Sequence, residues 1–163
     1  MLQVEHGIAN LLAAARSRGV SGKKNSITEN EVPMPHVTLE YSNNLPKPVD
    51  FPGLFRRIHE ALVGFPPIKL SDIKSRATGY DTFLIGAGNP ETVFVHLTVA
   101  VLKGRTIDER KKMSEKLLQL LEVAFHETYL TRPCDITVDI REIERETYGK
   151  LMNELARQVA KRE

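Results

Sequence analysis

A pattern of strand, helix and strand occurs twice along this chain, and the repeat constrains the fold more than any other feature of the sequence. The first copy predicts a strand, a helix and a strand over residues 36–42, 51–63 and 72–85. The second copy predicts the same elements over residues 92–102, 106–129 and 135–141. A helix between two strands returns the chain along the sheet, so each copy is a βαβ unit with parallel strands.

Side-chain spacing supports these elements. In the first strand, Val37, Leu39 and Tyr41 alternate with polar residues, which is the period of a half-buried strand. The second helix begins with Thr106-Ile-Asp-Glu109, a capping box in which the Thr hydroxyl and the Glu carboxylate bond to free backbone amides. Both predicted helices also carry one apolar face, as expected for helices that pack on a sheet.

Two βαβ units placed side by side form a four-stranded sheet with two helices on one face. The predicted fold class is therefore α+β, an α/β two-layer arrangement of duplicated βαβ units. The Gly-Asn-Pro sequence at 88–90 predicts a hairpin between the strands at 72–85 and 92–102. We also expect the sheet face opposite the helices to be apolar and to be buried by oligomerisation.

Composition divides the chain into three segments. Residues 1–33 are predicted to be an N-terminal extension that the mature protein can lack. It comprises a short helix and a linker rich in Gly, Ser, Asn and charged residues. Residues 34–150 are predicted to form the domain. The charged sequence from Glu144 onward predicts a partly helical end, of which residues 151–163 form a C-terminal tail.

The charge balance gives no sign of a polyanionic partner. Twenty-three basic and 21 acidic residues leave a formal net charge of +2, so we expect no nucleic-acid partner. No stretch approaches the roughly 20 apolar residues of a membrane-spanning helix, so we expect no membrane partner. The single cysteine, Cys134, cannot form an intramolecular disulfide, which is typical of a reducing compartment. We therefore predict a cytoplasmic protein.

The usual motifs of metal and nucleophilic catalysis are missing from the sequence. Its histidines occur singly, with no HExxH or Cys-x-x-Cys motif, so no metal site is predicted. Cys134 follows a proline and precedes a strand, and is interpreted as a structural thiol. His36 and His96 are interpreted as sheet residues hydrogen-bonded to neighbours. Gly86-Ala-Gly88 lacks the third glycine of a dinucleotide-binding motif and precedes a strand, so it predicts a turn.

Five segments resemble, in order, the motifs of one known family. They are Met34-Pro-His36, Asp50-Phe-Pro-Gly-Leu-Phe55, Ile73-Lys-Ser-Arg76, Phe94-Val-His-Leu-Thr98 and Gly104-Arg-Thr106. On these motifs, the chain from Met34 to about Lys150 resembles the 5-carboxymethyl-2-hydroxymuconate isomerase family of the tautomerase superfamily. The expected fold is thus tautomerase-like.

The resemblance implies a homotrimeric isomerase that needs no cofactor. The implied reaction is the keto-enol (dienol) tautomerisation of 5-carboxymethyl-2-hydroxymuconate, or of a similar unsaturated 2-hydroxy carboxylate, in aromatic catabolism. The implied general base and acid is an N-terminal proline, which matches Pro35. A terminal proline is a basic secondary amine, whereas an internal proline is an amide without basicity. Without the resemblance, Pro35 would be an ordinary proline at the start of a strand.

The resemblance also implies cationic side chains that bind the substrate carboxylates and the developing dienolate. The matching residues are Lys74, Arg76 and Arg105. Lys74 stands where the family commonly carries an arginine, so it keeps the charge but loses bidentate geometry. Arg105 precedes a helix N-terminus, which also favours anions. Each of the three could instead be a solvated surface charge.

The sequence departs from the family at its start, because 34 residues precede Pro35. Pro35 can be the base only if Met34 is the true initiator or if the extension is cleaved. Two alternatives remain open. In the first, the extension is genuine and the chain is a catalytically silent trimeric scaffold. In the second, a tautomerase relative with the same terminal proline acts as a hydratase or dehalogenase on unsaturated acids.

Overall fold

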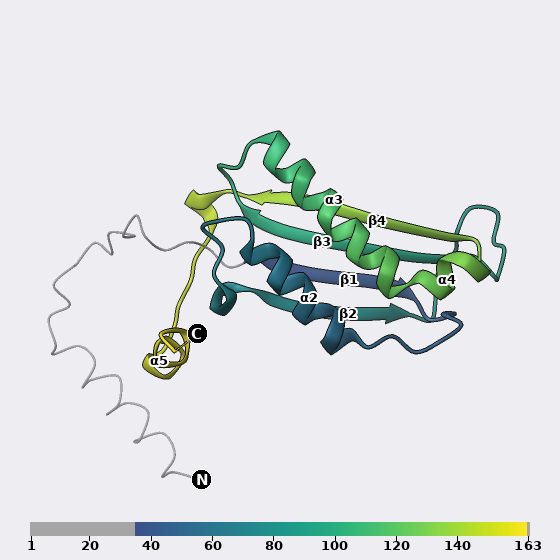
Figure 1. Cartoon of the computed structure of the whole chain (residues 1–163), viewed down its shortest axis with the longest axis horizontal. Coiled ribbons are helices and arrows are strands. Elements are labelled where there is room, and N and C mark those ends of the chain that lie inside the picture. The colour runs from purple at the N-terminus through teal and green to yellow at the C-terminus, as the bar shows by residue number, and fades with distance from the viewer. Residues whose placement is uncertain (1–34, 163) are drawn as a thin grey trace, which may run out of the picture. The chain divides into compact units, whose positions relative to one another are not determined.

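The computed structural model describes residues 35–162 as one mixed sheet with helices packed against it. Figure 1 shows this arrangement. The strands are β1 (His36–Ser42), β2 (Lys74–Tyr80), β3 (Val93–Leu102) and β4 (Cys134–Ile143). The helices are α2 (Phe51–Val63), α3 (Ile107–Ala124), α4 (His126–Thr131) and α5 (Glu154–Ala160), with 3₁₀ turns η1 (Leu70–Asp72) and η2 (Arg145–Thr147).

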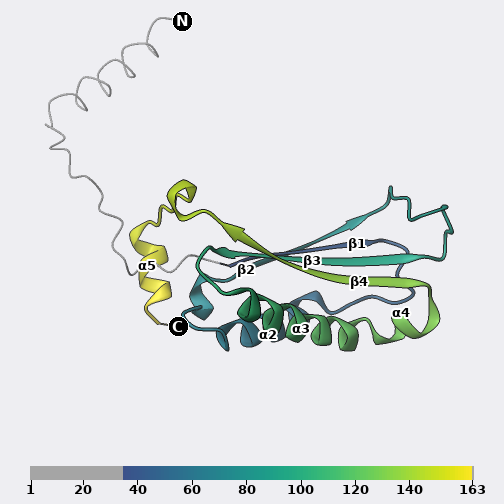
Figure 2. The same cartoon turned by 90° about the horizontal axis from the view of Figure 1, so that it is seen from above.

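The sheet topology confirms the predicted fold class. The strand order is β2-β1-β3-β4, with β1 parallel to β2 and β3 parallel to β4. The central pair, β1 and β3, is antiparallel. Two βαβ units placed edge to edge produce this order. Helices α2 and α3 cover the same face of the sheet (Figure 2).

The core lies between that face and the two long helices. Val37 and Leu39 of β1 point into it, as does every second residue of β3. Helix α2 contributes Leu54, Ile58 and Leu62, and α3 contributes Met113, Leu117 and Leu121, all of them fully buried. These are the apolar faces that helical periodicity predicts.

The second predicted strand is shorter than expected, and the predicted hairpin is wrong. Strand β2 ends at Tyr80 because β1, its one partner among residues 35–162, ends opposite it at Ser42. The next strand, β3, pairs with the other edge of β1, so β2 and β3 are not neighbours. Asn44 donates hydrogen bonds to the carbonyls of Pro90 and Thr92, at 2.8 and 2.9 Å, and so holds the connecting loop near the end of β1.

The second half of the domain also differs from its prediction in two places. The helix predicted over 106–129 is interrupted at Phe125, whose φ of −107° and ψ of 19° leave the helical region while its side chain is buried in the core. The last strand is longer than the predicted 135–141, because β4 pairs with β3 along its full length.

The sheet face opposite the helices is mainly polar, which corrects the expectation of an apolar face. Alternation places His36, Thr38 and Glu40 of β1 on this open face. The neighbouring strands add mostly charged and hydroxyl-bearing residues, and the apolar exceptions are Phe94, Ala100, Leu102 and Ile143. Hydrogen bonds between strands, such as Tyr80 to Glu40, run across this face.

The chain after β4 turns back toward the first βαβ unit. We call residues 144–150 the return segment. The Tyr148 hydroxyl lies 3.3 Å from Nε2 of His36, and Lys150 forms an ion pair of 3.3 Å with Asp72 of η1. Helix α5 then packs against η1, which agrees with the partly helical end that the sequence predicts. The predictions for residues 1–33 lie outside the described residues.

Candidate active site

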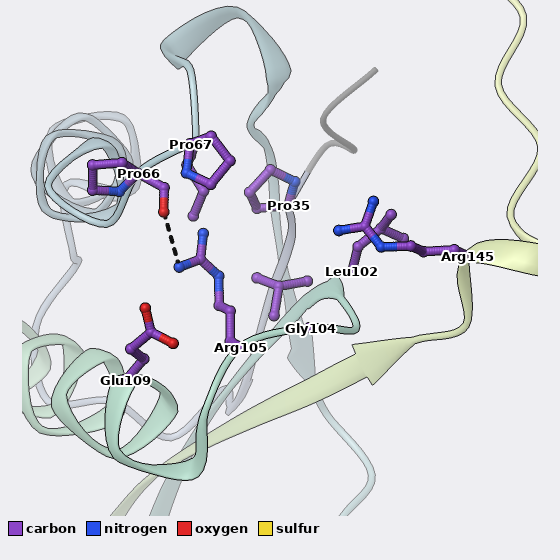
Figure 3. Close-up of a pocket in the computed structure, with 10 residues that line it drawn as sticks. Pro35, Pro66, Pro67, Leu102, Gly104, Arg105, Glu109 and Arg145 are labelled. Atoms are coloured by element: carbon purple, nitrogen blue, oxygen red, sulfur yellow. Dashed lines mark hydrogen bonds between the residues drawn. The ribbon is translucent and has the colours of Figure 1, made fainter. Parts of the chain in front are cut away.

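A pocket of about 210 Å³ opens at the end of the sheet where β1 begins (Figure 3). Its walls come from the start of β1, the loop after α2, the segment between β3 and α3, and the return segment. The lining residues are Pro35, Pro66, Pro67, Ile68, Val101, Leu102, Gly104, Arg105, Glu109 and Arg145. The pocket therefore combines apolar walls with three charged side chains.

Pro35 is buried in the wall of this pocket. Its carbonyl accepts a hydrogen bond of 3.0 Å from the backbone amide of Lys74, which ties the start of β1 to the start of β2. Ile68 and Val101, both buried, line the pocket with it. Pro35 thus shares the pocket wall with apolar side chains, an environment that disfavours a charged amine.

Arg105 is the cation that the local fold places most firmly in the pocket. It directly precedes Thr106, the N-cap of α3. Its guanidinium donates to the carbonyl oxygens of Phe65 at 3.0 Å and Pro66 at 3.3 Å, and so joins the loop after α2 to the start of α3. Burial lowers the pKa of Arg105, and the charge of Glu109 opposes that shift. The group stays cationic, because a guanidinium is not deprotonated in proteins.

Glu109 supplies the negative charge of the pocket, and its main partner is the helix cap. Its carboxylate accepts from the Thr106 amide at 2.8 Å and from the Thr106 hydroxyl at 2.9 Å. In return, the Thr106 oxygen accepts from the Glu109 amide, so the predicted capping box is present. The hydrogen bonds from Thr106, backbone amide first, lower the pKa of Glu109. The carboxylate is therefore ionised and is engaged by its own helix.

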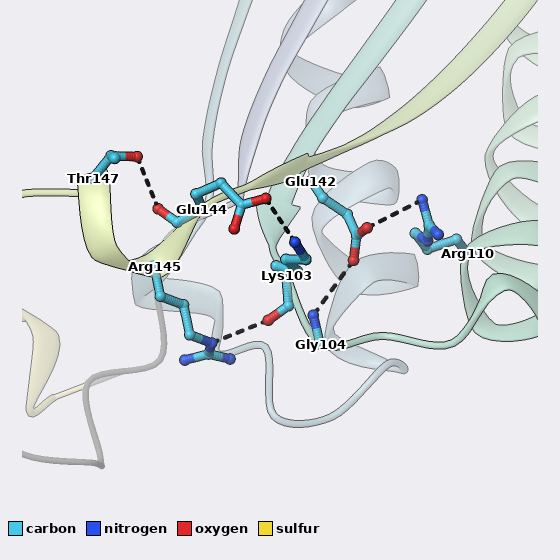
Figure 4. A network of polar contacts seen from close by, with 7 residues as sticks. All are labelled: Lys103, Gly104, Arg110, Glu142, Glu144, Arg145 and Thr147. Atoms are coloured by element: carbon cyan, nitrogen blue, oxygen red, sulfur yellow. Dashed lines mark hydrogen bonds and ion pairs between the residues drawn. The ribbon is translucent and has the colours of Figure 1, made fainter.

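Arg145 is a pocket residue that the sequence reasoning missed. It follows β4, and its Nε donates to the Lys103 carbonyl at 3.0 Å (Figure 4). No family motif includes Arg145, because it lies beyond the last segment that resembles the family. Parallel pairing could have found it, since β3 and β4 end at the same edge of the sheet and are followed by Arg105 and Arg145, respectively.

Lys74 and Arg76 do not line the pocket. Both are exposed residues of β2, and their side chains belong to the open face of the sheet. There they lie near His36, whose pKa is lowered first by burial and then by the charges of Arg76 and Lys74. Of the predicted site residues, the fold therefore brings Pro35 and Arg105 together in the pocket and leaves Lys74 and Arg76 outside it, on the open face of the sheet.

The remaining chemically reactive side chains are engaged elsewhere. His96 lies 2.7 Å from the Thr137 hydroxyl and 3.1 Å from the Thr98 hydroxyl, as a sheet residue bonded to its neighbours. Burial, and then the charge of Asp135, raise the pKa of the Cys134 thiol, which disfavours a nucleophilic thiolate. Within residues 35–162, no three His, Cys, Asp or Glu side chains gather as a metal site. No helix in the same range has the length and apolar character to cross a membrane.

Comparison with known families gives one match that covers most of the chain. Residues 35–158 match the model of the 5-carboxymethyl-2-hydroxymuconate isomerase family. The match begins at Pro35 and includes all four predicted site residues. A curated relative, the 5-carboxymethyl-2-hydroxymuconate Delta-isomerase of Escherichia coli, is 29% identical over 110 residues, which are 68% of this chain and 87% of that protein.

Solved structures agree with this match. The crystal structure of a 5-carboxymethyl-2-hydroxymuconate isomerase from Deinococcus radiodurans R1 is 29% identical and superposes with a TM-score of 0.69, covering 78% of this chain and 96% of that one. A fused 4-OT described as a symmetric trimer shares the fold at 17% identity, with a TM-score of 0.57 over 75% of this chain and 98% of that one.

Proposed function

The chain belongs to the 5-carboxymethyl-2-hydroxymuconate isomerase family, and on that premise we propose that it catalyses keto-enol tautomerisation with Pro35 as general base and acid. The proposed substrate is 5-carboxymethyl-2-hydroxymuconate or a similar unsaturated 2-hydroxy carboxylate. The observation that carries the proposal is the position of Pro35, buried in the wall of a pocket that also holds the guanidinium of Arg105. The related proteins are named as isomerases, which supports an isomerase function.

The chemistry needs a base that is neutral near pH 7 and that returns the proton it takes. In a chain that begins at Pro35, the ring nitrogen is a secondary amine, and an α-amino group ordinarily titrates near about 8. In that chain, the apolar side chain of Ile68 and the positive charge of Arg105, which line the same pocket, would both disfavour the protonated amine. The neutral amine takes the hydroxyl proton of the dienol. The ammonium then returns a proton to a carbon of the conjugated chain and leaves the ketone.

Arg105 is the group that we propose stabilises the negative charge in this step. Its position is held by the Phe65 and Pro66 carbonyls and by the capped start of α3. A guanidinium fixed before the reaction, in a partly buried site, stabilises a developing dienolate or a substrate carboxylate more than a mobile surface charge does. Arg105→Lys keeps the positive charge but loses the planar guanidinium, so it should lower the activity even though the charge is retained.

The proposal is tested on a chain that begins at Pro35. We expect it to convert the dienol of 5-carboxymethyl-2-hydroxymuconate to its ketone, followed by the loss of the dienol ultraviolet absorbance. One added residue before Pro35 should lower kcat by about 10²-fold or more, because it converts the amine to an amide while keeping the ring, and general base catalysis typically contributes about 10²- to 10⁴-fold. Pro35→Ala keeps a terminal amine, now a primary one, and should lower kcat by less.

The N-terminal sequence of the protein from its native host completes this test. A mature chain that starts at Pro35 supports the mechanism, whereas a mature chain that starts at Met1 removes the base. Full activity of the chain with one added residue before Pro35 would also overturn the mechanism. Circular dichroism of each variant checks that the fold is retained.

We also propose that the protein is a homotrimer in which the open face of the sheet is buried between subunits. A relative of the same fold is described as a symmetric trimer, and the exposed residues Lys74 and Arg76 would then serve sites shared between subunits. Light scattering should give a mass near three times the 18.4 kDa of the chain. A monomer would contradict this proposal.

Subunit mixing tests where Lys74 and Arg76 act. We expect the chain with one added residue before Pro35 to be inactive and Lys74→Gln to be impaired when each is assayed alone. If the two residues serve one site from different subunits, mixed trimers contain some intact sites and regain part of the activity. Activity that is no higher than the average of the two pure variants would show that Lys74 does not act across the interface.

A further inference from the structure

We propose that Arg145 binds a second carboxylate of the substrate and thereby makes the pocket selective for dicarboxylates. This inference rests on the proposed function, because it concerns the same pocket, and it deepens that function by adding a residue of the return segment. Figure 3 shows Arg105 and Arg145 on either side of the Pro35 ring. A molecule that spans the pocket with one anionic group at each end would meet both guanidinium groups.

The guanidinium of Arg145 has donors available for such a ligand. Its Nε bonds to the Lys103 carbonyl, and neither Nη1 nor Nη2 has a hydrogen-bond partner among residues 35–162. In contrast, both terminal nitrogens of Arg105 donate to backbone carbonyls. Arg145 can therefore present a pair of N–H groups to a carboxylate without giving up its contact with the protein.

Among residues 35–162, no acidic side chain forms an ion pair with Arg145, and two of the acidic residues near it are paired with other cations. Glu144, its neighbour in the chain, forms an ion pair with Lys103 at 2.8 Å. Glu142 pairs with Arg110 at 3.6 Å and also accepts from the Gly104 amide at 3.4 Å. Figure 4 shows how these contacts arrange the polar groups around Arg145. The positive charge of Arg145 is thus left for a ligand.

The same contacts hold Arg145 at the pocket. The Lys103 amide donates to the Ile143 carbonyl, and the Lys103 carbonyl accepts from Arg145, so the ends of β3 and β4 are joined by backbone and side-chain bonds. Gly104 lies under the guanidinium, since a Cβ built there would be 3.8 Å from Nη2 of Arg145, and its φ of 128° favours glycine. The turn at Lys103 and Gly104, which leads to Arg105, therefore also contacts the Arg145 guanidinium.

The charge of the pocket favours an anionic ligand, and its two separate guanidinium groups favour one with two carboxylates. Arg105 and Arg145 contribute two positive charges, and Glu109, whose carboxylate accepts hydrogen bonds from Thr106, contributes one negative charge. A dicarboxylate would neutralise both arginines, whereas a monocarboxylate would leave one of them without a partner. Loss of one charged hydrogen-bond pair typically weakens binding roughly ten- to hundredfold.

Binding of two unreactive ligands tests this inference. Hexa-2,4-dienedioate and hexa-2,4-dienoate have the same six-carbon diene and differ only in a terminal carboxylate against a methyl group. Neither carries the 2-hydroxyl group that the reaction needs, so binding does not depend on catalysis by Pro35. Isothermal titration calorimetry is carried out on the full 163-residue chain and on Arg145→Gln, Arg145→Lys and, as a matched control, Arg56→Gln of the exposed face of α2.

We expect the wild-type chain to bind the dienedioate at least tenfold more tightly than the dienoate. Arg145→Gln should weaken dienedioate binding by about ten- to hundredfold and change dienoate binding by less than threefold. Arg145→Lys should lie between the two, because it keeps the charge and loses the bidentate geometry. Arg56→Gln, which removes the same charge away from the pocket, should leave both affinities unchanged.

The proposal is overturned if the wild-type chain binds neither ligand or binds both equally. It is also overturned if Arg145→Gln weakens both ligands to the same extent, since that is the result expected of a purely structural residue. The two proposals can fail separately. An inactive chain that selects the dienedioate through Arg145 would refute only the tautomerase mechanism, and an active chain whose selectivity ignores Arg145 would refute only this inference.

Discussion

The ion pair between Lys150 and Asp72 is predicted to anchor the return segment to the first βαβ unit. The Nζ and Oδ1 atoms are 3.3 Å apart, and the two side chains are only 14% and 15% exposed. We predict that Lys150→Met destabilises the protein, because methionine keeps the apolar length of the lysine stem and removes its charge. Asp72 would then be left as a nearly buried carboxylate without its partner.

The size of the effect follows from the distance and the burial. With an effective dielectric constant of roughly 20, two opposite charges at this separation attract by about 5 kcal/mol, and desolvation offsets most of this attraction. Breaking a fully buried pair costs about 3–5 kcal/mol. Because both groups keep some contact with water, we expect Lys150→Met to lower the free energy of unfolding by about 2–3 kcal/mol and Asp72→Asn to lower it by about 1–2 kcal/mol.

Urea unfolding of the two single variants and the double variant measures the coupling. The double variant leaves no charge unpaired, so its loss should be no larger than that of Lys150→Met alone, which gives a coupling energy of at least about 1–2 kcal/mol. Coincident transitions by fluorescence and circular dichroism would establish that unfolding is two-state. Single effects that add to within about 0.5 kcal/mol would refute the reasoning, because independent sites behave in that way.

Three other predictions concern the elements around the pocket. Thr106→Ala should lower the free energy of unfolding by about 1 kcal/mol, because it removes the hydroxyl of the capping box, and Thr106→Ser should lose less; equal losses in the two would contradict this role of the hydroxyl. Leu117→Ala should lower the free energy of unfolding in urea by about 2–5 kcal/mol, because the side chain is fully buried. Leu117→Met should lower it by less than about 1.5 kcal/mol, because methionine nearly conserves the volume. A loss below about 1 kcal/mol for the alanine variant would show that the core collapses around the smaller side chain. Burial lowers the pKa of His36 and His59 below 6.5, so the unfolded chain binds protons more readily and stability should fall as the pH drops below about 6.5. His36→Gln should flatten that pH dependence in thermal melts, and an unchanged slope would exclude His36 as a contributor.

The order of the elements could be predicted from the sequence because it depends on local periodicity. The alternation of apolar and polar residues in β1 and the capping box at Thr106 both involve residues that are close in the sequence. Each therefore predicts its strand or helix without knowledge of the rest of the fold. The two-layer fold follows from the repeat, because a βαβ unit has one favoured handedness. The motif around Pro35 likewise lies in consecutive residues.

Which strands pair, and where they end, was decided by the tertiary structure. The predicted hairpin was wrong because β3 finds its partner in β1, a choice that depends on residues more than 50 positions apart. Strand β2 stops where β1 stops, and β4 extends as far as β3 does, because a strand without a partner loses its backbone hydrogen bonds.

The pocket shows the same division between local and non-local information. Pro35 and Arg105 could be named in advance because each lies in a short motif of the family. Arg145 could not, because its place in the pocket depends on the pairing of β3 with β4 and on the bond to the Lys103 carbonyl. Lys74 and Arg76 share a strand face as expected, but only the assembled sheet shows that both lie outside the pocket that Pro35 lines. The sequence by itself determined the order of the elements and named Pro35 as the proposed base, whereas the tertiary structure decided which charges lie in its pocket, because contacts between distant segments form only when the sheet is assembled.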